Sequence, residues 1–485
     1  MIHLKPVFFV VAILLLFAGC VLLVPLAYIL FTQAAAGADA QAFLTTSLMA
    51  FGVGAPLAIA TRKADFRLVP RQMYLLTVLS WIVIAVVSAL PFILSSMQLS
   101  IVDAVFEAVS GITTTGSTIL VELHKVPDAI LLWRALLQWM GGIGIIVMAV
   151  AIMPHLRVGG MRLFRSEASD KSEKFTARSS AVARSIGIVY MALSIACALS
   201  YWISGMDGFN AILHSMTTVS TGGYSTSDMS IRQFASPAVI WTSCTFMFLS
   251  GLPFILLGQL FRGKPEPILR DHQVRGYAVF VGAAILVTFL WLIYSYGIPV
   301  TEAFSLAAFN TISIITTTGY TNIDYNLWGG LAVGMFFFLT FTGACAGSTA
   351  GGIKIFRFQI GILMLRNQIR AMVHPRVVAP SFYNGKPILE DIITSVIAFS
   401  FVFAGTVAVV AVALSITGLD LITSLSGAAT AVANVGPGLG DTIGPVGNFT
   451  SLSVAAKWII IVAMLAGRLE ILTVLVIFTP VFWRG

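Results

Sequence analysis

The sequence predicts an all-α polytopic membrane protein, in which four tandem helix–pore-loop–helix units surround one central pore and two extra N-terminal transmembrane helices precede them. Three observations support this fold class. Of the 485 residues, 58% are hydrophobic and only 10% are charged, whereas soluble domains carry about 25% charged residues. Several apolar runs reach the roughly 20 residues that a helix needs to cross a bilayer. Short polar loops with a central glycine recur between these runs.

The first two predicted helices lie at about 6–31 and 40–60, before the first polar loop, and no later unit has a counterpart to them. The apolar run from Val7 to Phe31 has 25 residues, more than the roughly 7–15 of a secretory signal. We therefore expect it to remain in the protein as a transmembrane helix. Residues 1–65 form this first predicted region.

Each predicted unit contains a long apolar helix, a half-length helix, a glycine loop and a second long helix. The predicted units cover 66–165, 166–265, 266–380 and 381–485, with half-length helices at about 103–113, 208–219, 302–315 and 420–433. The second long helices are expected at about 127–154, 236–261, 327–370 and 452–480. Irregular backbone at membrane depth is tolerated only where protein or water surrounds it, so we expect the loops to meet inside the protein.

The four glycine loops are the candidate ion-binding site. Their key glycines are separated by 106, 97 and 117 residues. Glycine allows successive carbonyl oxygens to point inward, and rings of backbone carbonyls can replace the hydration shell of a cation. One such motif would be weak evidence, but four in the same context favour a site for a permeating monovalent cation. The candidate residues are Thr113, Thr114, Thr115 and Gly116; Val219, Ser220, Thr221 and Gly222; Thr316, Thr317, Thr318 and Gly319; and Asn434, Val435 and Gly436.

Lys and Arg concentrate in the segments that join one unit to the next, at 155–184, 262–275 and 366–386. An excess of these residues marks cytoplasmic loops, so the junctions and both termini are expected in the cytoplasm and the glycine loops outside. The basic segments are either a solvated face or also a surface for a cytoplasmic partner. Their distribution in short loops argues against nucleic acid as a partner.

Two further features stand out in the last helices of units three and four. The segment 327–370 has 44 residues, about twice a membrane span. Glycines in its middle either break the helix or allow tight helix packing, and their number favours a break. Arg468 lies deep in the last apolar helix, where a charge is costly and usually functional; a structural ion pair is the alternative. The glycine-rich residues are Gly343, Ala344, Cys345, Ala346, Gly347, Ser348, Thr349, Ala350, Gly351, Gly352 and Lys354.

Along its whole length the chain resembles the Trk/Ktr/HKT superfamily of potassium transport proteins, and its two extra N-terminal helices point to the Trk branch. Three stretches carry the resemblance: Phe106-Glu107-Ala108 leading to Ser110-Gly111-Ile112-Thr113-Thr114-Thr115-Gly116, then Gln138-Trp139-Met140-Gly141-Gly142-Ile143-Gly144, and Ala466-Gly467-Arg468-Leu469-Glu470-Ile471. The resemblance implies a gated potassium-selective pore, with Gly343 to Lys354 as an intramembrane gating loop and Arg468 as a positive charge beside it.

The resemblance also implies the setting of the protein. Potassium would be the transported ion, with rubidium also permeant, and uptake would cross the bacterial inner membrane. A homodimer and a cytosolic nucleotide-binding regulatory subunit of the RCK type are the expected partners, besides the lipid bilayer. No organic cofactor is expected, and the sequence contains no catalytic constellation or nucleotide-binding motif.

The alternative function is a secondary transporter, coupled to Na⁺ or H⁺, with broken helices and a site at the membrane midplane. Its inverted repeats would put successive units in opposite orientations. The charge pattern instead assigns all four glycine loops to one side of the membrane, which favours the pore.

Overall fold

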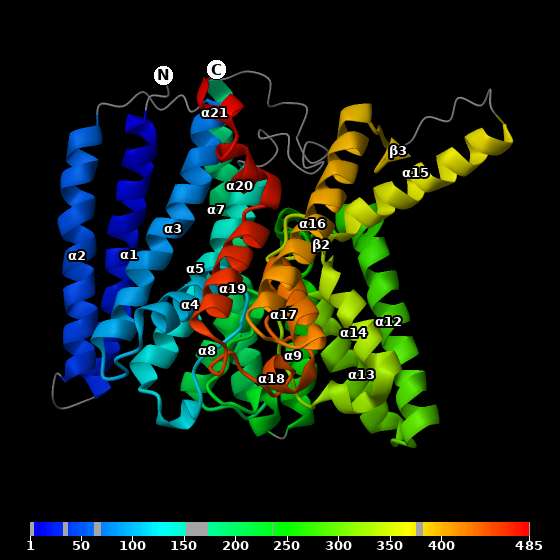
Figure 1. The fold of residues 1–485 in the computed structure, drawn as a ribbon, viewed down its shortest axis with the longest axis horizontal. Coiled ribbons are helices and arrows are strands. Elements are labelled where there is room, and N and C mark those ends of the chain that lie inside the picture. The colour runs from blue at the N-terminus through cyan, green and yellow to red at the C-terminus, as the bar shows by residue number, and fades with distance from the viewer. Residues whose placement is uncertain are drawn as a thin grey trace.

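The computed structural model of the protein describes residues 4–32, 37–62, 69–151, 173–234, 236–374 and 382–484. Much of the basic junction expected at 155–184 and the loop at 63–68 lie outside these residues. The described chain is mostly helical (Figure 1), with only short strands. This agrees with the helical fold class that the composition predicts.

Seven helices in the described residues are long and apolar enough to cross a membrane. The first two, α1 and α2, pack side by side at one edge of the molecule (Figure 1). The remaining five are distributed through the rest of the chain, so the protein is an integral membrane protein. The seven are α1 (Lys5–Thr32), α2 (Ala38–Thr61), α3 (Pro70–Leu94), α5 (Asp128–Ala151), α7 (Glu173–Ile203), α12 (His272–Tyr296) and α16 (Glu390–Ile416).

Four of the shorter helices each lead into one of the predicted glycine loops, and they have 12 to 16 residues, which is less than a span requires. Three begin with a side-chain cap, because the Ser100 hydroxyl and the Asp207 and Asp420 carboxylates accept backbone N–H bonds. Bonds from the Thr423 hydroxyl and backbone N–H hold the pKa of Asp420 below its usual range. We call these the half-helices: α4 (Ile101–Ile112), α8 (Gly208–Val219), α13 (Val300–Ile315) and α17 (Leu421–Ala433).

Two spans that the sequence predicts to be continuous are broken. The expected helix at 236–261 divides into α9 (Pro237–Ser250) and α10 (Phe254–Phe261), bent by 107°. Pro253, which lacks an N–H donor, lies in the gap. The expected helix at 452–480 divides into α19 (Val454–Arg468) and α20 (Ile471–Ile477), bent by 105°. Here Glu470 adopts a left-handed backbone with φ 60°.

The expected break in unit three is present. Helices α14 (Gly329–Phe341) and α15 (Ile355–Val373) are separated by strands β1 (Thr342–Gly343) and β2 (Ile353–Lys354), which pair in parallel. The pairing holds the two ends of the intervening loop together. Helix α15 then projects from the body of the molecule (Figure 1).

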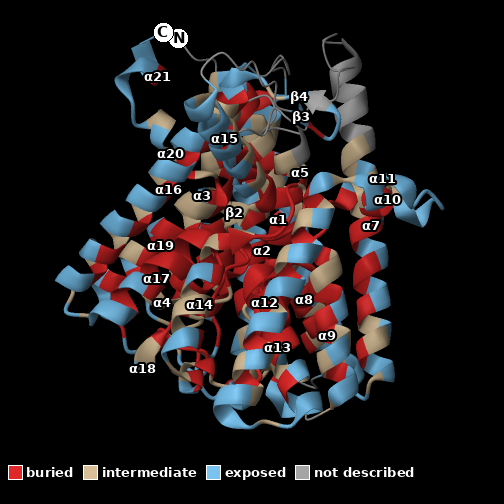
Figure 2. Ribbon diagram, turned by 90° about the vertical axis from the view of Figure 1, so that its right-hand side faces the viewer, coloured by how far each residue is buried: buried red, intermediate tan, exposed pale blue. Residues whose placement is uncertain are grey.

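The first turn of α1 and the last helix, α21 (Pro480–Arg484), lie at the same end of the molecule (Figure 1). Helix α15 lies at this end too (Figure 2). Buried residues concentrate in the middle, where the half-helices terminate (Figure 2). The remaining elements are η1 (Leu123–Lys125), η4 (Ser230–Phe234), η5 (Tyr325–Trp328), α11 (Glu266–Arg270), α18 (Gly440–Ile443), β3 (Phe382–Tyr383) and β4 (Lys386–Pro387).

Candidate functional site

The same backbone turn ends all four half-helices. A residue in the left-handed region, with φ between 53° and 57°, is followed two positions later by a glycine with φ between 76° and 108°. Between them, one N–H donates to the helical carbonyl five residues earlier, as from Thr115 to Ser110 at 2.9 Å. This is the Schellman arrangement. The left-handed residues are Thr114, Thr221, Thr317 and Asn434, and the glycines are Gly116, Gly223, Gly319 and Gly436.

Threonine is an unusual choice for the left-handed position. A β-branched residue with positive φ is a genuine outlier, at a cost of the order of 1–3 kcal/mol. Three of the four turns nevertheless use it, at Thr114, Thr221 and Thr317. Retained strain of this kind is typical of functional sites. The turns are therefore built for more than ending a helix.

The second turn is shifted by one residue from the sequence assignment. The sequence analysis takes Gly222 as the key glycine, but Gly223 has the positive φ that matches Gly116. Gly222 instead matches Thr115, since its N–H donates to the Thr217 carbonyl at 2.9 Å. The sequence does not distinguish the two positions, because two adjacent glycines both suit a tight turn.

The four turns, which we call the glycine loops, contact each other in cyclic order. A Cβ atom built on Gly116 would collide with the carbonyl oxygen of Gly222, and one built on Gly223 would collide with that of Thr318. Gly319 faces the Val435 carbonyl in the same way, and the position of a Cβ on Gly436 is 2.8 Å from the Thr115 carbonyl. Each loop thus packs on the next, and the fourth returns to the first.

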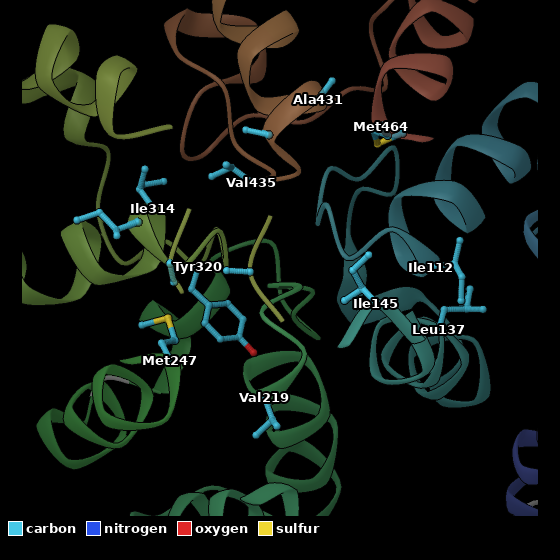
Figure 3. Close-up of a cluster of buried hydrophobic side chains, with 14 of the residues drawn as sticks. Ile112, Leu137, Ile145, Val219, Met247, Ile314, Tyr320, Ala431, Val435 and Met464 are labelled. Atoms are coloured by element: carbon cyan, nitrogen blue, oxygen red, sulfur yellow. The ribbon is translucent and has the colours of Figure 1, made fainter. Parts of the chain in front are cut away.

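Buried residues around the loops have the same cyclic arrangement. In Figure 3, Ile112 and Leu137 lie on one side of a common centre, with Val219, Ile314 and Val435 on successive other sides. These five residues come from four different parts of the chain, so the centre is built jointly by sequence segments hundreds of residues apart.

The residue after each glycine reaches back to the preceding loop or its half-helix. The Ser117 hydroxyl donates to the Gly436 carbonyl at 2.9 Å, and the Tyr224 hydroxyl donates to the Glu107 carbonyl at 3.0 Å. The Tyr320 and Thr217 hydroxyls are 2.5 Å apart. Pro437 packs against Gly319. These contacts form a second set of links around the same centre.

In three of the loops, a polar side chain nine residues before the matching glycine contacts the chain segment that follows this glycine. The His214 ring lies 3.0 Å from the Ser225 hydroxyl, and Asn310 donates to the Asn322 side chain at 2.8 Å. Glu107 holds the equivalent place in the first loop. This position could not be found from the sequence, because the three residue types differ and Gly427 replaces them in the fourth half-helix.

Glu107 forms a buried ion pair that joins the first two loops. Its carboxylate accepts from Arg134 Nε at 2.7 Å, and the two side chains are 0% and 2% exposed. The carboxylate also accepts from the Thr118 hydroxyl and the Ile119 N–H. Arg134 donates to the Ser225 carbonyl of the second loop. The pair therefore fixes the two chain segments that follow Gly116 and Gly223.

A cavity of about 100 Å³ lies on one side of the glycine loops. Its lining includes Gly116, Gly223, Gly319 and Gly436, together with residues of the segment 444–449. All four matching glycines therefore border one space. The shift from Gly222 to Gly223 is consistent with this lining, in which Gly222 does not appear.

The glycine-rich segment of unit three, Thr342–Lys354, contacts three of the four turns, and we call it the inner segment. The Thr349 hydroxyl donates to the Val219 carbonyl at 3.1 Å, and the Gly351 N–H donates to the Thr317 hydroxyl at 2.7 Å. The Gly352 N–H donates to the Ala433 carbonyl at 2.8 Å. These partners are at or next to the C-terminal ends of half-helices, so the segment lies directly against the ring.

Arg468 borders a second cavity, of about 40 Å³, together with Gly351, Lys354 and Glu470. Its side chain is buried, and its three guanidinium nitrogens have no hydrogen-bond partner within the described residues. Glu470 pairs instead with Arg357 at 2.7 Å. The ion-pair alternative for Arg468 therefore finds no partner in the described part of the chain.

The arrangement defines a class of protein. Polytopic helices, half-helices too short to span a membrane and buried polar loops that meet at one centre are features of membrane channels and transporters. Comparison with known proteins narrows the class. Residues 39–484 match the family model TrkH, described as a cation transport protein. The chain belongs to this family of transport proteins and is not an enzyme.

Relatives match it over almost their full length. The chain is 46% identical over 480 residues to the Trk system potassium uptake protein TrkI of Halomonas elongata, covering 99% of this chain and 97% of that protein. It is 37% identical over 492 residues to TrkH of Escherichia coli K12, covering 99% and 100%. The crystal structure of the potassium transporter TrkH from Vibrio parahaemolyticus matches with a TM-score of 0.91 at 33% identity, covering 100% of both chains.

Proposed function

We propose that this protein takes up potassium ions through a gated, selective pore whose narrowest part is the ring of glycine loops. The observation that carries the proposal is the cyclic contact, in which each loop's glycine packs on the carbonyl group of the next. A closed ring of backbone carbonyls can substitute for the water around a potassium ion. The names of the relatives, potassium uptake proteins in both cases, support the choice of ion.

The half-helices favour a cation at the centre. Their C-terminal ends lead directly into the ring, and helix C-termini carry a partial negative charge. The turns leave carbonyl groups of the loops without helical partners, and these are the groups available to an ion. We assign ion binding to Thr113 through Gly116, Ser220 through Gly223, Thr316 through Gly319, and Asn434 through Gly436. The carbonyl of Val219 already accepts from Thr349.

We propose that the inner segment is the gate. It hydrogen-bonds to three of the turns, and none of its residues is among those that line the 100 Å³ cavity. In this position it closes the path of an ion leaving the ring. Arg468, buried next to it without a counter-ion in the described residues, adds electrostatic repulsion against a cation.

We also propose the division into units, the membrane orientation and the partners that the sequence predicts. The four units are 66–165, 166–265, 266–380 and 381–485, after two extra helices in 1–65. The basic junctions and both termini are assigned to the cytoplasm and the glycine loops to the outside of a bacterial inner membrane. A homodimer and a cytosolic nucleotide-binding subunit of the RCK type complete the transport system.

The test is rubidium or thallium flux into proteoliposomes of the purified protein. We expect uptake that follows the electrochemical gradient of the permeant ion and is blocked by excess potassium. Sodium and proton gradients are imposed in turn at fixed membrane potential. Uptake that requires one of these gradients would indicate a coupled secondary transporter instead of a pore. Absence of any uptake by protein that remains folded would refute both.

A further inference from the structure

A large apolar cavity lies behind the first glycine loop, away from the proposed ion path. Its volume is about 440 Å³, and it opens between α1, α3 and α5. The hydroxyl of Thr77, one of its few polar groups, already donates to the Met73 carbonyl at 2.8 Å. The lining residues are Val10, Leu14, Phe17, Ala18, Leu76, Thr77, Ser80, Trp81, Ile84, Ile112, Met140, Gly141, Ile143, Gly144, Val147 and Met148.

Ordered water does not fill such an apolar cavity, because each ordered water needs two to four polar hydrogen-bond partners. The cavity has roughly three times the volume of an apolar cavity of about 150 Å³ that accommodates benzene. All three surrounding helices are long and apolar enough to span a membrane, so the medium outside them is hydrocarbon. Phe17, on the lining, is 53% exposed, which gives that hydrocarbon access.

We propose that this cavity binds one acyl chain of a membrane phospholipid. An acyl chain is long, flexible and entirely apolar, as the cavity requires, and it is already concentrated at the entrance. Each methylene group that leaves the bilayer for the cavity exchanges one apolar environment for another. Binding therefore depends on fit and on filling the void, since an unfilled apolar cavity loses the dispersion contacts of its walls.

The bound chain would support the first glycine loop. Ile112, on the lining, is the last residue of α4 and immediately precedes Thr113. Gly141, also on the lining, packs against the Ile112 carbonyl so closely that a Cβ atom would collide with it. The cavity lining is therefore in direct contact with the end of α4 that leads into the loop. An acyl chain would thus restrain the end of α4 from the membrane side.

The test uses a substitution that fills the cavity. Gly144 is an exposed lining residue, and an added Cβ would meet only Trp81, at 3.9 Å. Gly144→Leu can therefore extend into the space without a backbone collision. Gly282→Leu is the matched control, because Gly282 is exposed on the spanning helix α12 with nothing within 4 Å of an added Cβ. Ser80→Leu fills the same cavity from α3 and serves if Gly144→Leu does not fold.

The probe is a phosphatidylcholine with a photoreactive diazirine on its palmitoyl chain, reconstituted with each purified variant. Labelled peptides are mapped by mass spectrometry. In the unmodified protein and in Gly282→Leu we expect label on cavity residues of α1, α3 and α5. The cavity-filling variant should lose most of this label, because the new side chain occupies the space that the acyl chain would fill. Label that is equal in all variants, or absent from the cavity in the unmodified protein, would overturn the proposal.

A second measurement concerns the loop, and it rests on the proposed function. Ion flux through the unmodified protein and Gly282→Leu should change with the chain length of the surrounding phospholipid, whereas flux through Gly144→Leu should not. If cavity labelling is found but no variant conducts ions, the acyl-chain site stands and the proposed function fails. If flux responds to chain length equally in Gly144→Leu and in Gly282→Leu, the supporting role of the chain is refuted.

Discussion

At the scale of single residues, the second glycine loop offers the sharpest test of which glycine, Gly222 or Gly223, matches the glycines of the other three loops. Gly223 combines a φ of 76° with contact against the backbone carbonyl of Thr318, whereas a Cβ on Gly222 would meet only the side chain of Gln138. A backbone carbonyl cannot move without distorting the ring, whereas the Gln138 side chain can move at the loss of its two hydrogen bonds to the second loop. Gly223→Ala should therefore abolish selective flux, because strain of about 1–3 kcal/mol is concentrated in the ring. Gly222→Ala should retain measurable flux.

Rubidium flux with and without competing sodium, in proteoliposomes, measures this difference. Equal protein folding is checked by size-exclusion chromatography. A greater loss of flux or selectivity in Gly222→Ala than in Gly223→Ala would contradict the assignment of Gly223 as the matching glycine.

The buried pair Glu107–Arg134 leads to a prediction about stability. Removing one partner of a buried pair leaves an unpaired charge, which typically costs about 3–5 kcal/mol. Arg134→Met should therefore lower the thermal unfolding temperature strongly. The double variant Glu107→Gln with Arg134→Met should recover part of the loss, because no charge remains buried. Thermal unfolding followed by intrinsic fluorescence in detergent compares the three proteins, and a double variant less stable than Arg134→Met would argue against the pair.

Arg468 leads to a prediction about conduction. If its charge repels cations next to the gate, Arg468→Ala should raise ion flux by about two- to tenfold, the range expected for one partly screened charge at short distance. Arg468→Lys keeps the charge and is the control. Flux through Arg468→Ala that equals flux through the unmodified protein would remove the residue from the conduction path.

At the scale of elements, the inner segment can be tested by shortening it. Strands β1 and β2 pair in parallel at Thr342–Ile353 and Gly343–Lys354, so the two ends of the segment remain close when its middle is removed. Deleting 345–351 eliminates the hydrogen bonds from Thr349 and Gly351 to the turns. Basal flux should then rise severalfold. Lower flux through a folded deletion variant would indicate that the segment supports the ring and does not close it.

The elements also show what the sequence could predict. The half-helices and their loops follow from apolar runs that are too short to span, and the break in unit three follows from its glycines. The bend at Pro253 was predictable from the sequence, since a proline inside an apolar run interrupts a helix. The bend after Arg468 had no comparable signal, because Gly467 packs against the Val432 carbonyl, a contact that sequence alone does not reveal.

The support behind the loops could not be predicted for a different reason. Glu107, His214 and Asn310 occupy equivalent places but have different chemistry, so no motif identifies them. Arg134 and Ser225, which complete the first of these networks, are 91 residues apart. Likewise the partner of Lys457 is Asp103, at 2.6 Å but 354 positions away. Such pairs depend on the arrangement of the units, which only the folded chain provides.

At the scale of the whole molecule, the ring depends on all four glycine loops together, but the chain between them need not be continuous. Gly263, between α10 and α11, lies in an exposed turn with nothing within 4 Å of an added Cβ. Exposed connections of this kind tolerate cleavage because they hold few contacts. Residues 1–263 and 264–485, expressed together as separate chains, should therefore assemble and conduct ions.

Affinity purification through a tag on one half, followed by flux measurement, tests this expectation. Neither half alone should conduct, because each contains only two of the four glycine loops. Flux from a single half would show that the ring is not the conducting element. Failure of the two halves to associate would show that the covalent connection is itself required.

The links between the last unit and the first have a consequence for biosynthesis. The Phe449 N–H donates to the Thr118 carbonyl at 2.9 Å, and the Ser117 hydroxyl reaches Gly436. The ribosome completes Ser117 more than three hundred residues before its partner Gly436. The nascent protein must therefore hold three loops in the membrane with their polar backbone incompletely paired until the fourth arrives. A message truncated before the last unit yields a product with an open ring, which we expect the cell's membrane quality-control proteases to recognise.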